Sequence, residues 1–299
     1  MITWDIAIKE FINFLRLERS LSPNSIEAYK NDINKLILYQ QSKGLSILPQ
    51  QIDIDHLRNF IHWINELGMS PRSQSRVISG IKSFYKYLLI ENHIQKDPTE
   101  LLEAPRLGRN LPQVLSVEEI DLLIGVIDLS QPEGQRNKAI IETLYSCGLR
   151  VSELIHLKLS NLYFKQGFIR IIGKGNKERL VPINNKAVKE INYYLEYRKL
   201  LDIKKGHEDI LFLNRRGQQL TRVMIYTIVN RFAQKAHIKK KISPHILRHS
   251  FATHLIEGGA DLRAIQEMLG HESIITTEIY AHLDRDYLRH TIIEHHPRS

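Results

Sequence analysis

The 299-residue sequence is poor in cysteine, in long apolar runs and in nucleotide-binding motifs. Its one cysteine, Cys147, excludes an internal disulfide and fits a reducing compartment. No apolar run is long enough to cross a membrane, and the acids Asp5 and Glu10 make the first residues unlike a signal peptide. Without a Walker-type loop there is no sign of nucleotide use, and no cofactor is expected. These absences predict a cytoplasmic globular protein.

Acidic residues are also missing from the places where basic residues gather. The formal net charge is +9, but acids and bases balance in residues 1–103, so the whole excess lies in residues 104–299. Within the balanced part, no acid interrupts residues 70–90. A basic excess of this size favours a polyanionic partner.

Two domains are expected from the length and from breaks in the helical pattern. Four helices with short connections suggest a small bundle in residues 1–103. They are predicted over residues 4–18, from Ser22-Pro23, from Asp53 to about Gly68, and from Ser70-Pro71 to about Glu91. The stretch from Lys96 to Pro112 has three prolines and few apolar anchors, so a linker is placed within it, at residues 104–112. Residues 113–299 then form the second domain.

The helix predicted from Ser70 has two unlike faces. Apolar side chains recur on one face with a helical period, and four cations recur on the other. These cations are Arg72, Arg76, Lys82 and Lys86. Such a stripe fits a solvated surface, and it equally fits a surface that binds backbone phosphates.

Residues 168–183 predict a β-hairpin, because two β-rich runs flank Gly173-Lys174-Gly175-Asn176. The expected fold class is therefore mainly α with a small antiparallel β-sheet. The hairpin carries Lys174, Lys177 and Arg179, although a cationic turn is often only a soluble turn. Upstream, Arg150 stands in the motif GLRVSEL at the start of another predicted helix.

The stretch from Ser243 to Tyr280 concentrates residues suited to phosphodiester chemistry. Ser243-Pro244 opens a helix on which His245, Arg248 and His249 share one face. Asp261 caps a second helix that ends before His271, and Tyr280 follows nine residues later. Arginine holds non-bridging oxygens, histidine moves protons near neutral pH, and a phenol assisted by a base can be a nucleophile.

A zinc site is the weaker interpretation of the same stretch. Four histidines could be ligands: His245, His249, His254 and His271. No cysteine or carboxylate completes a usual ligand set, and Arg248 lies among the candidates, so no metal is expected.

The order H-x-L-R-H-S-F-A-T-H-L, then L-G-H, then a tyrosine, resembles the tyrosine recombinase family of DNA strand-exchange enzymes. The resemblance covers essentially the whole chain, and the length and overall pattern are similar to the bacterial Xer recombinases. It implies a C-shaped clamp around duplex DNA. Residues 1–103 would be its helical core-binding domain, and residues 113–299 its α+β catalytic domain with a C-terminal interaction tail.

The resemblance implies a role for each matched residue. Tyr280 would be the nucleophile, forming a 3′-phosphotyrosyl intermediate, and His245 would accept its proton. Lys174 would protonate the leaving 5′-oxygen. The remaining residues would bind the phosphate; they are Arg150, Arg248 and His271. Expected DNA contacts are Arg72, Arg76, Lys82, Lys86, Lys177 and Arg179. The division of labour between the two histidines stays open.

The implied function is site-specific DNA recombination, with the Xer likeness favouring resolution of chromosome dimers for segregation at cell division. The working form would be a tetramer of sister recombinase subunits on two DNA sites, with a DNA translocase as a further candidate partner. A phage or transposon integrase is the alternative within the family. A type IB topoisomerase and a DNA-binding protein that no longer cuts are less favoured, because the N-terminal bundle and the filled catalytic set argue against them.

The tail beyond Tyr280 has an apolar stripe that must be buried. Its members are Leu283, Leu288, Ile292 and Ile293. The stripe can pack on its own domain, or it can pack on a neighbouring subunit, as the resemblance favours.

Overall fold

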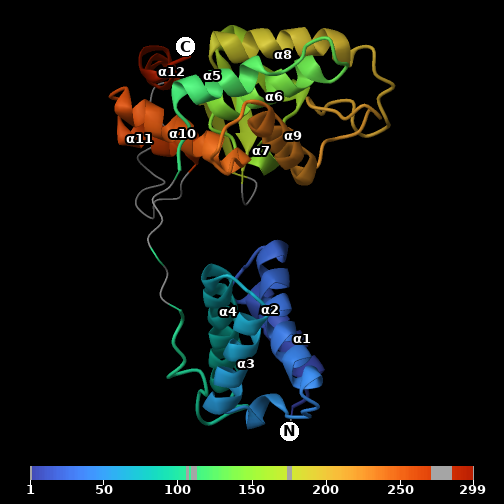
Figure 1. The fold of residues 1–299 in the computed structure, drawn as a ribbon, viewed down its shortest axis with the longest axis vertical. Helices are drawn as coiled ribbons and strands as arrows, with labels where there is room; N and C mark the ends of the chain where they lie inside the picture. Colours follow the sequence, from blue (N-terminus) through green and yellow to red (C-terminus); the bar gives the residue numbers. More distant parts are fainter. Residues whose placement is uncertain (1, 106–107, 109–112, 174–176, 271–284, 299) are drawn as a thin grey trace. The chain divides into compact units, whose positions relative to one another are not determined.

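The computed structural model describes residues 2–105, 108, 113–173, 177–270 and 285–298 (Figure 1). The chain divides into two compact units, Met1–Asn110 and Leu111–Ser299. Each unit has its own apolar core. Among these residues, no helix is long and apolar enough to cross a membrane.

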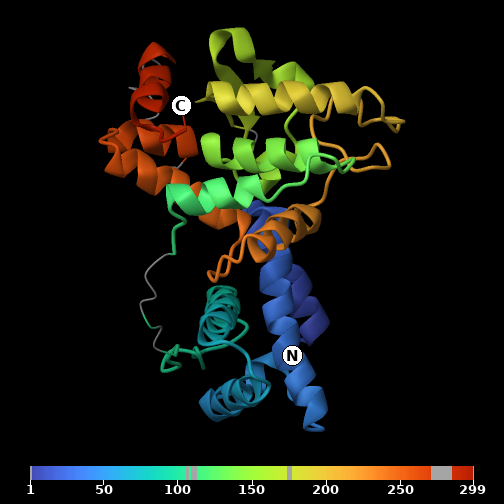
Figure 2. The ribbon, with the colours of Figure 1, turned by 45° about the horizontal axis from the view of Figure 1, so that its top comes forward.

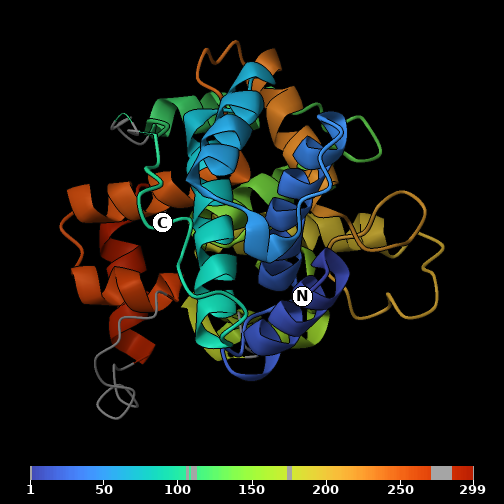
Figure 3. The ribbon, with the colours of Figure 1, turned by 90° about the horizontal axis from the view of Figure 1, so that it is seen from below.

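The first unit is a bundle of four helices, α1 to α4, and α2 lies against both α1 and α4 (Figures 1 and 3). The helices span Trp4–Leu17, Pro23–Ser42, Ile54–Glu66 and Pro71–Ile90. The caps read from the sequence hold: side chains of Ser22, Asp53 and Ser70 each accept a hydrogen bond from a backbone N–H three residues later. The predicted bundle is confirmed, with a short 3₁₀ turn, Pro49–Gln51, added before α3.

The second unit combines eight α-helices in its described residues with a three-stranded antiparallel sheet. Its helices are α5 Val117–Gly125, α6 Gly134–Ser146, α7 Val151–Ile155, α8 Asn185–Arg198, α9 Arg222–Lys235, α10 Pro244–Glu257, α11 Leu262–Leu269 and α12 Arg285–His295. The strands are β1 Leu162–Tyr163, β2 Phe168–Ile172 and β3 Glu178–Pro182, in the order β1-β2-β3. The predicted hairpin is β2–β3, with Ile169 opposite Val181.

Two details of the second unit differ from the sequence reading. Residues 210–213 contain Ile-Leu-Phe-Leu, a run that would suit a short strand, but they make only isolated bridges, between Lys158 and Ile210 and between Leu213 and Gln219. Ser243 occupies the N-cap of α10, but its side chain makes no capping hydrogen bond with the described residues. Pro244, at the first helical position, starts that helix as predicted.

Helix α6 is the centre of the second unit, because nearly all of its side chains are buried. It runs alongside α8 and also contacts α5 and α10 (Figure 2). Cys147 follows α6 and is fully buried. Burial raises the pKa of the Cys147 thiol well above its usual value, so this cysteine is a small core residue without thiolate character.

The tail helix α12 packs on its own unit, against α10, α11 and β3. Leu288 and Ile292 join the apolar core with 4% and 1% exposure, while Ile293 is about half exposed. Leu283 lies outside the described residues. In the isolated chain, the apolar stripe of the tail therefore packs on its own domain, which is one of the two alternatives that the sequence left open.

Polar contacts extend this anchorage to the last described residues. The guanidinium of Arg298 forms ion pairs with Asp121 and with the buried carboxylate of Glu142. Asn184 Nδ2 donates to the carbonyl oxygen of Arg298 at 2.9 Å. His296 is 3% exposed, and burial lowers its pKa to about 4, so it stays neutral at physiological pH.

Replacing Ile292 with alanine tests this packing. Removing a fully buried isoleucine should lower the free energy of unfolding by roughly 2–5 kcal/mol, through lost transfer energy and a cavity. Ile293→Ala, next to it but half exposed, is the matched control and should cost much less. Urea denaturation of the DNA-free protein measures both. Equal small losses would show that the tail is not held on its own unit.

Candidate active site

The site begins at a turn that only glycine can make. Gly148 has φ +57°, and a Cβ there would stand 2.4 Å from the ring of Phe251 on α10. The turn delivers Arg150 to the N-cap of α7 with extended backbone angles. Glu153, one turn later, then accepts the Arg150 N–H through Oε2 and the Arg150 guanidinium through Oε1, each at 2.8 Å. The GLRVSEL motif is therefore a capped helix start that fixes an arginine.

Arg248 reaches the same place from α10. Its two terminal nitrogens donate to the carbonyl oxygens of Gly148 and Leu269, at 2.7 and 2.6 Å. Its guanidinium stands 3.8 Å from Glu153 Oε2, and its side chain is 10% exposed. Burial, with the charge of Arg150, lowers the pKa of Arg248 to about 10, so it remains cationic at neutral pH.

One buried carboxylate, that of Glu153, holds three guanidiniums. Arg179 on β3 makes a fork, with Nη1 and Nη2 donating to Oε1 and Oε2 of Glu153 at 2.8 and 2.9 Å. Arg150 and Arg248 are the other two. Burial alone would raise the pKa of Glu153, but the hydrogen bonds and charges of Arg179 and Arg150 hold it below its ordinary value. Three cations around one anion leave the cluster positively charged.

The histidines of α10 do not converge. His245 and His249 are exposed, whereas His254 is 7% exposed, and the Tyr145 hydroxyl lies 2.7 Å from its Nδ1. Within the described ranges, no group of three or more His, Cys, Asp or Glu side chains is placed to hold a metal. His271, the fourth candidate for zinc, lies outside them. His245 stays available at the start of the helix that carries Arg248.

Three predicted catalytic residues lie outside the described part of the chain; they are Lys174, His271 and Tyr280. For two of them, the residue immediately before is described. Lys174 follows Gly173 directly, and His271 follows Gly270, whose carbonyl oxygen accepts a hydrogen bond from Arg150 Nη2 at 3.2 Å.

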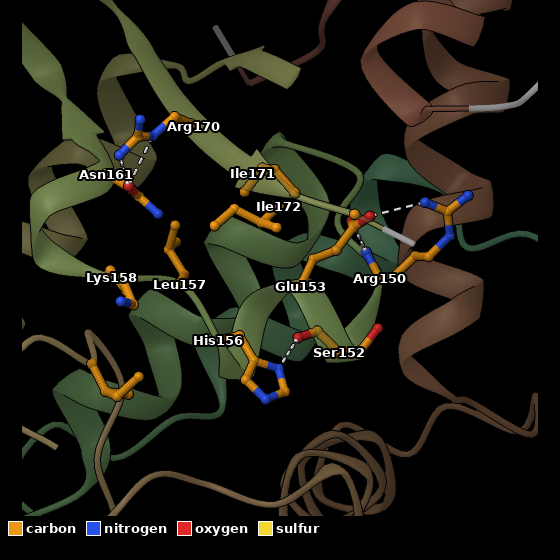
Figure 4. Close-up of a pocket in the computed structure, with 12 residues that line it drawn as sticks. Arg150, Ser152, Glu153, His156, Leu157, Lys158, Asn161, Arg170, Ile171 and Ile172 are labelled. Atoms are coloured by element: carbon orange, nitrogen blue, oxygen red, sulfur yellow. Dashed lines mark hydrogen bonds and ion pairs between the residues drawn. The ribbon is translucent and has the colours of Figure 1, made fainter. Parts of the chain in front are cut away.

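A cavity of about 470 Å³ opens beside Arg150 and extends along α7 and β2 (Figure 4). Its wall includes Arg150, His156, Lys158 and Arg170. Arg170 is held by the amide oxygen of Asn161, which accepts from Nε at 3.0 Å and from Nη2 at 2.8 Å. Two cations of this wall are also paired with surface carboxylates: Arg170 lies 3.6 Å from Glu178, and Lys158 lies 3.8 Å from Asp209.

The four cations on the polar face of α4 differ in their exposure and in their ion pairs. Arg72 and Lys86 are exposed, and Lys82 is partly exposed. Arg76 is also exposed, but it pairs with Asp32 of α2 at 2.5 Å, and Asp32 is 2% exposed. A Cβ at Gly80 would come within 2.9 Å of Asp32, so the glycine makes room for the pair. The sequence did not reveal this contact, because its partners are 44 residues apart.

The two units match two family models. Residues 113–286 match the Phage integrase family, and residues 8–92 match the Phage integrase, N-terminal SAM-like domain. The chain therefore belongs to the phage integrase family of tyrosine recombinases. It is a site-specific recombinase, which confirms the enzyme class and the mainly α fold with a small antiparallel sheet.

Within this family, the chain is similar to several known Xer recombinases. Tyrosine recombinase XerD of Staphylococcus aureus (strain N315) is 41% identical over 292 residues, covering 98% of this chain and 99% of that protein. The crystal structure of XerA recombinase covers 99% of both chains, with 30% identity and a TM-score of 0.51. XerH site-specific recombinase, in its post-cleavage complex with palindromic difH substrate, has 25% identity and a TM-score of 0.70, covering 90% and 79%. The resemblance to Xer recombinases, and among them to XerD, which the ending HHPRS also favours, is confirmed.

Neutralising Glu153 tests the arginine cluster. Glu153→Gln leaves three close guanidiniums without their shared anion and should cost roughly 3–5 kcal/mol. For a unit of this size, that lowers Tm by about 10 °C. Glu178→Gln is the control, because its carboxylate is half exposed and lies 3.6 Å from Arg170 in a surface pair. Similar Tm values for the two variants in thermal denaturation would contradict the predicted importance of Glu153.

Proposed function

We propose that this enzyme cuts and rejoins duplex DNA by transesterification, with Tyr280 as nucleophile. The observation that carries the proposal is the pair of guanidiniums, Arg150 and Arg248, fixed side by side by Glu153. Two positioned, permanently charged forks suit the non-bridging oxygens of a phosphodiester. They would stabilise the extra charge that develops as the tyrosine oxygen attacks phosphorus.

The proposed proton transfers are those that the family resemblance implies for the matched residues, and the residue types suit them. His245 accepts the proton of the Tyr280 hydroxyl, because a phenol with an ordinary pKa near 10 is mostly neutral at pH 7. Lys174 gives a proton to the 5′-oxygen as the phosphorus–oxygen bond breaks, leaving a 3′-phosphotyrosine and a free 5′-hydroxyl. His271 donates a hydrogen bond to the phosphate. A partner strand's 5′-hydroxyl then attacks the phosphotyrosine and releases the tyrosine, so one ester replaces another.

The likeness to XerD supports resolution of chromosome dimers at a dedicated site as the biological role. Joining two duplexes calls for a tetramer of this chain and a sister recombinase, because each of the two sites has two strands to cut. The structure of XerH bound to difH substrate supports DNA as the partner. A chromosomal substrate places the enzyme in the cytoplasm, where Cys147 stays reduced. A DNA translocase remains a proposed activator, and residues 1–103 a proposed clamp.

The nucleophile is tested with Tyr280→Phe, which removes a single hydroxyl. The binding site must first be located by footprinting the protein on genomic DNA. A nicked duplex carrying that site should then trap a covalent protein–DNA adduct with the wild type. Tyr280→Phe should bind this duplex with unchanged affinity and yield no adduct on a denaturing gel. An adduct formed by the phenylalanine variant would reject Tyr280 as nucleophile.

The clamp is tested at the exposed cations of α4. If Arg72 and Lys86 each neutralise a phosphate, each alanine variant should reduce the slope of log K against log salt by about 1. Lys9→Ala removes an equal charge from the exposed surface of α1 and should leave the slope unchanged. Binding to a mixed-sequence duplex at several salt concentrations measures all three. Equal slopes for every variant would make the stripe a merely solvated face.

A further inference from the structure

Arg179 lies where the sequence suggested a DNA contact, but its guanidinium turns inward. Its side chain is 13% exposed, and three acceptor atoms inside the unit receive its hydrogen bonds. Two are the carboxylate oxygens of Glu153. A third is the carbonyl oxygen of Met268, which accepts from Nε at 2.9 Å. By contrast, Lys177, two residues earlier, is exposed.

The strand geometry explains this direction. Arg179 is opposite Ile171 in the β2–β3 ladder, and Val181 is opposite Ile169. Side chains two residues apart on a strand share a face, so Arg179 points to the same side as the fully buried Val181. At that depth its charge needs a buried anion, which Glu153 provides.

Arg179 therefore joins three elements that meet at the site. It is part of β3. Its guanidinium donates hydrogen bonds to Glu153 of α7 and to the carbonyl oxygen of Met268 at the C-terminal end of α11. Gly270 follows that end with φ +62°, and a Cβ there would stand 3.2 Å from three atoms of the Arg179 side chain. The turn before His271 is therefore built around this guanidinium.

We propose that Arg179 is a positioning residue for strand cleavage and does not contact DNA. Arg179 holds β3 and Gly270 in place relative to Arg150 and Arg248. These two parts of the chain adjoin the segments that carry Lys174 and His271. β3 starts four residues after Lys174, and Gly270 directly precedes His271. The inference rests on the proposed function, and it adds a residue that acts through others.

The chemistry of arginine makes this role specific. A guanidinium can place two parallel N–H bonds on a carboxylate while its Nε–H points to a third acceptor. A lysine at residue 179 would keep the charge but lose the fork and the fixed angle to Met268. The positioning role therefore requires the shape of the side chain as well as its charge.

The test compares binding and cleavage in Arg179→Gln and Arg179→Lys. On the nicked duplex at saturating protein, both variants should cleave roughly 10- to 100-fold more slowly, because a shift of about 1 Å in reacting groups has such effects. Their salt slope for duplex binding should equal that of the wild type, whereas Lys177→Gln should lower the slope. Combining Arg179→Gln with Glu153→Gln should slow cleavage no more than the worse single change, because both act through one contact.

Gly270→Ala gives an independent variant that retains every charge, should the Arg179 changes impair folding. Its methyl group would displace the Arg179 side chain and should slow cleavage, while Gly206→Ala should not. Gly206 is the matched control, with φ +89° and open space around a Cβ. Gly206→Ala therefore introduces the same kind of backbone strain as Gly270→Ala but no contact with Arg179.

Three results would overturn the inference: wild-type cleavage by Arg179→Gln, full rescue by Arg179→Lys, or a reduced salt slope that makes Arg179 a DNA contact. Wild-type cleavage by Gly270→Ala would also count against it. A wild type that forms no adduct would instead remove the proposed function itself. The two failures are thus distinguished by the wild-type reaction alone.

Discussion

The buried carboxylate of Glu153 is the interaction on which the rest of the site depends. Three guanidiniums from α7, α10 and β3 approach one another only because this anion lies among them, 5% exposed. An uncompensated charge at that depth would be strongly destabilising, so each partner requires the others. The same contact closes the N-terminus of α7 as a cap, so helix formation and arginine placement are a single event. The short motif GLRVSEL thus encodes both the local structure and the site.

The helix that carries Arg248 is also tied to the end of the chain. The Tyr145 hydroxyl lies against His254 on α10, and the His296 ring stands 4.9 Å from the Tyr145 ring. Leu288 and Ile292 enter the same core that supports α10. Packing of the tail and support of the helix that carries Arg248 therefore share side chains. Any rearrangement that moves α12 to another subunit must replace these buried contacts with equivalent ones, because the cavity left behind would be costly.

Much of this architecture could be predicted because it is local. Capping residues and turn glycines fixed the helix starts, and β-rich runs around a glycine turn fixed the hairpin. The inward turn of Arg179 was harder to predict. Counting by two from Val181 places it on the core face, but Leu180 beside it is apolar too, so alternation gave no clear direction. The Arg76–Asp32 pair and the seat of the tail depend on residues far apart in sequence, and periodicity carries no such information.

Among the described residues, the arginine cluster carries more positive than negative charge, which suits the phosphate of the proposed reaction. Its excess positive charge lowers the pKa of Arg248, after burial, through the neighbouring Arg150 and Arg179. The lowered pKa means that the protonated guanidinium of Arg248 is less stable in the DNA-free protein than it would be in water. A phosphate bearing negative oxygens removes part of this repulsion, so binding the substrate and stabilising the site are linked. The benefit is greatest where negative charge is greatest, which in transesterification is the pentavalent transition state. In the proposed reaction, a site with one carboxylate and three guanidiniums would therefore stabilise the transition state more than the bound substrate.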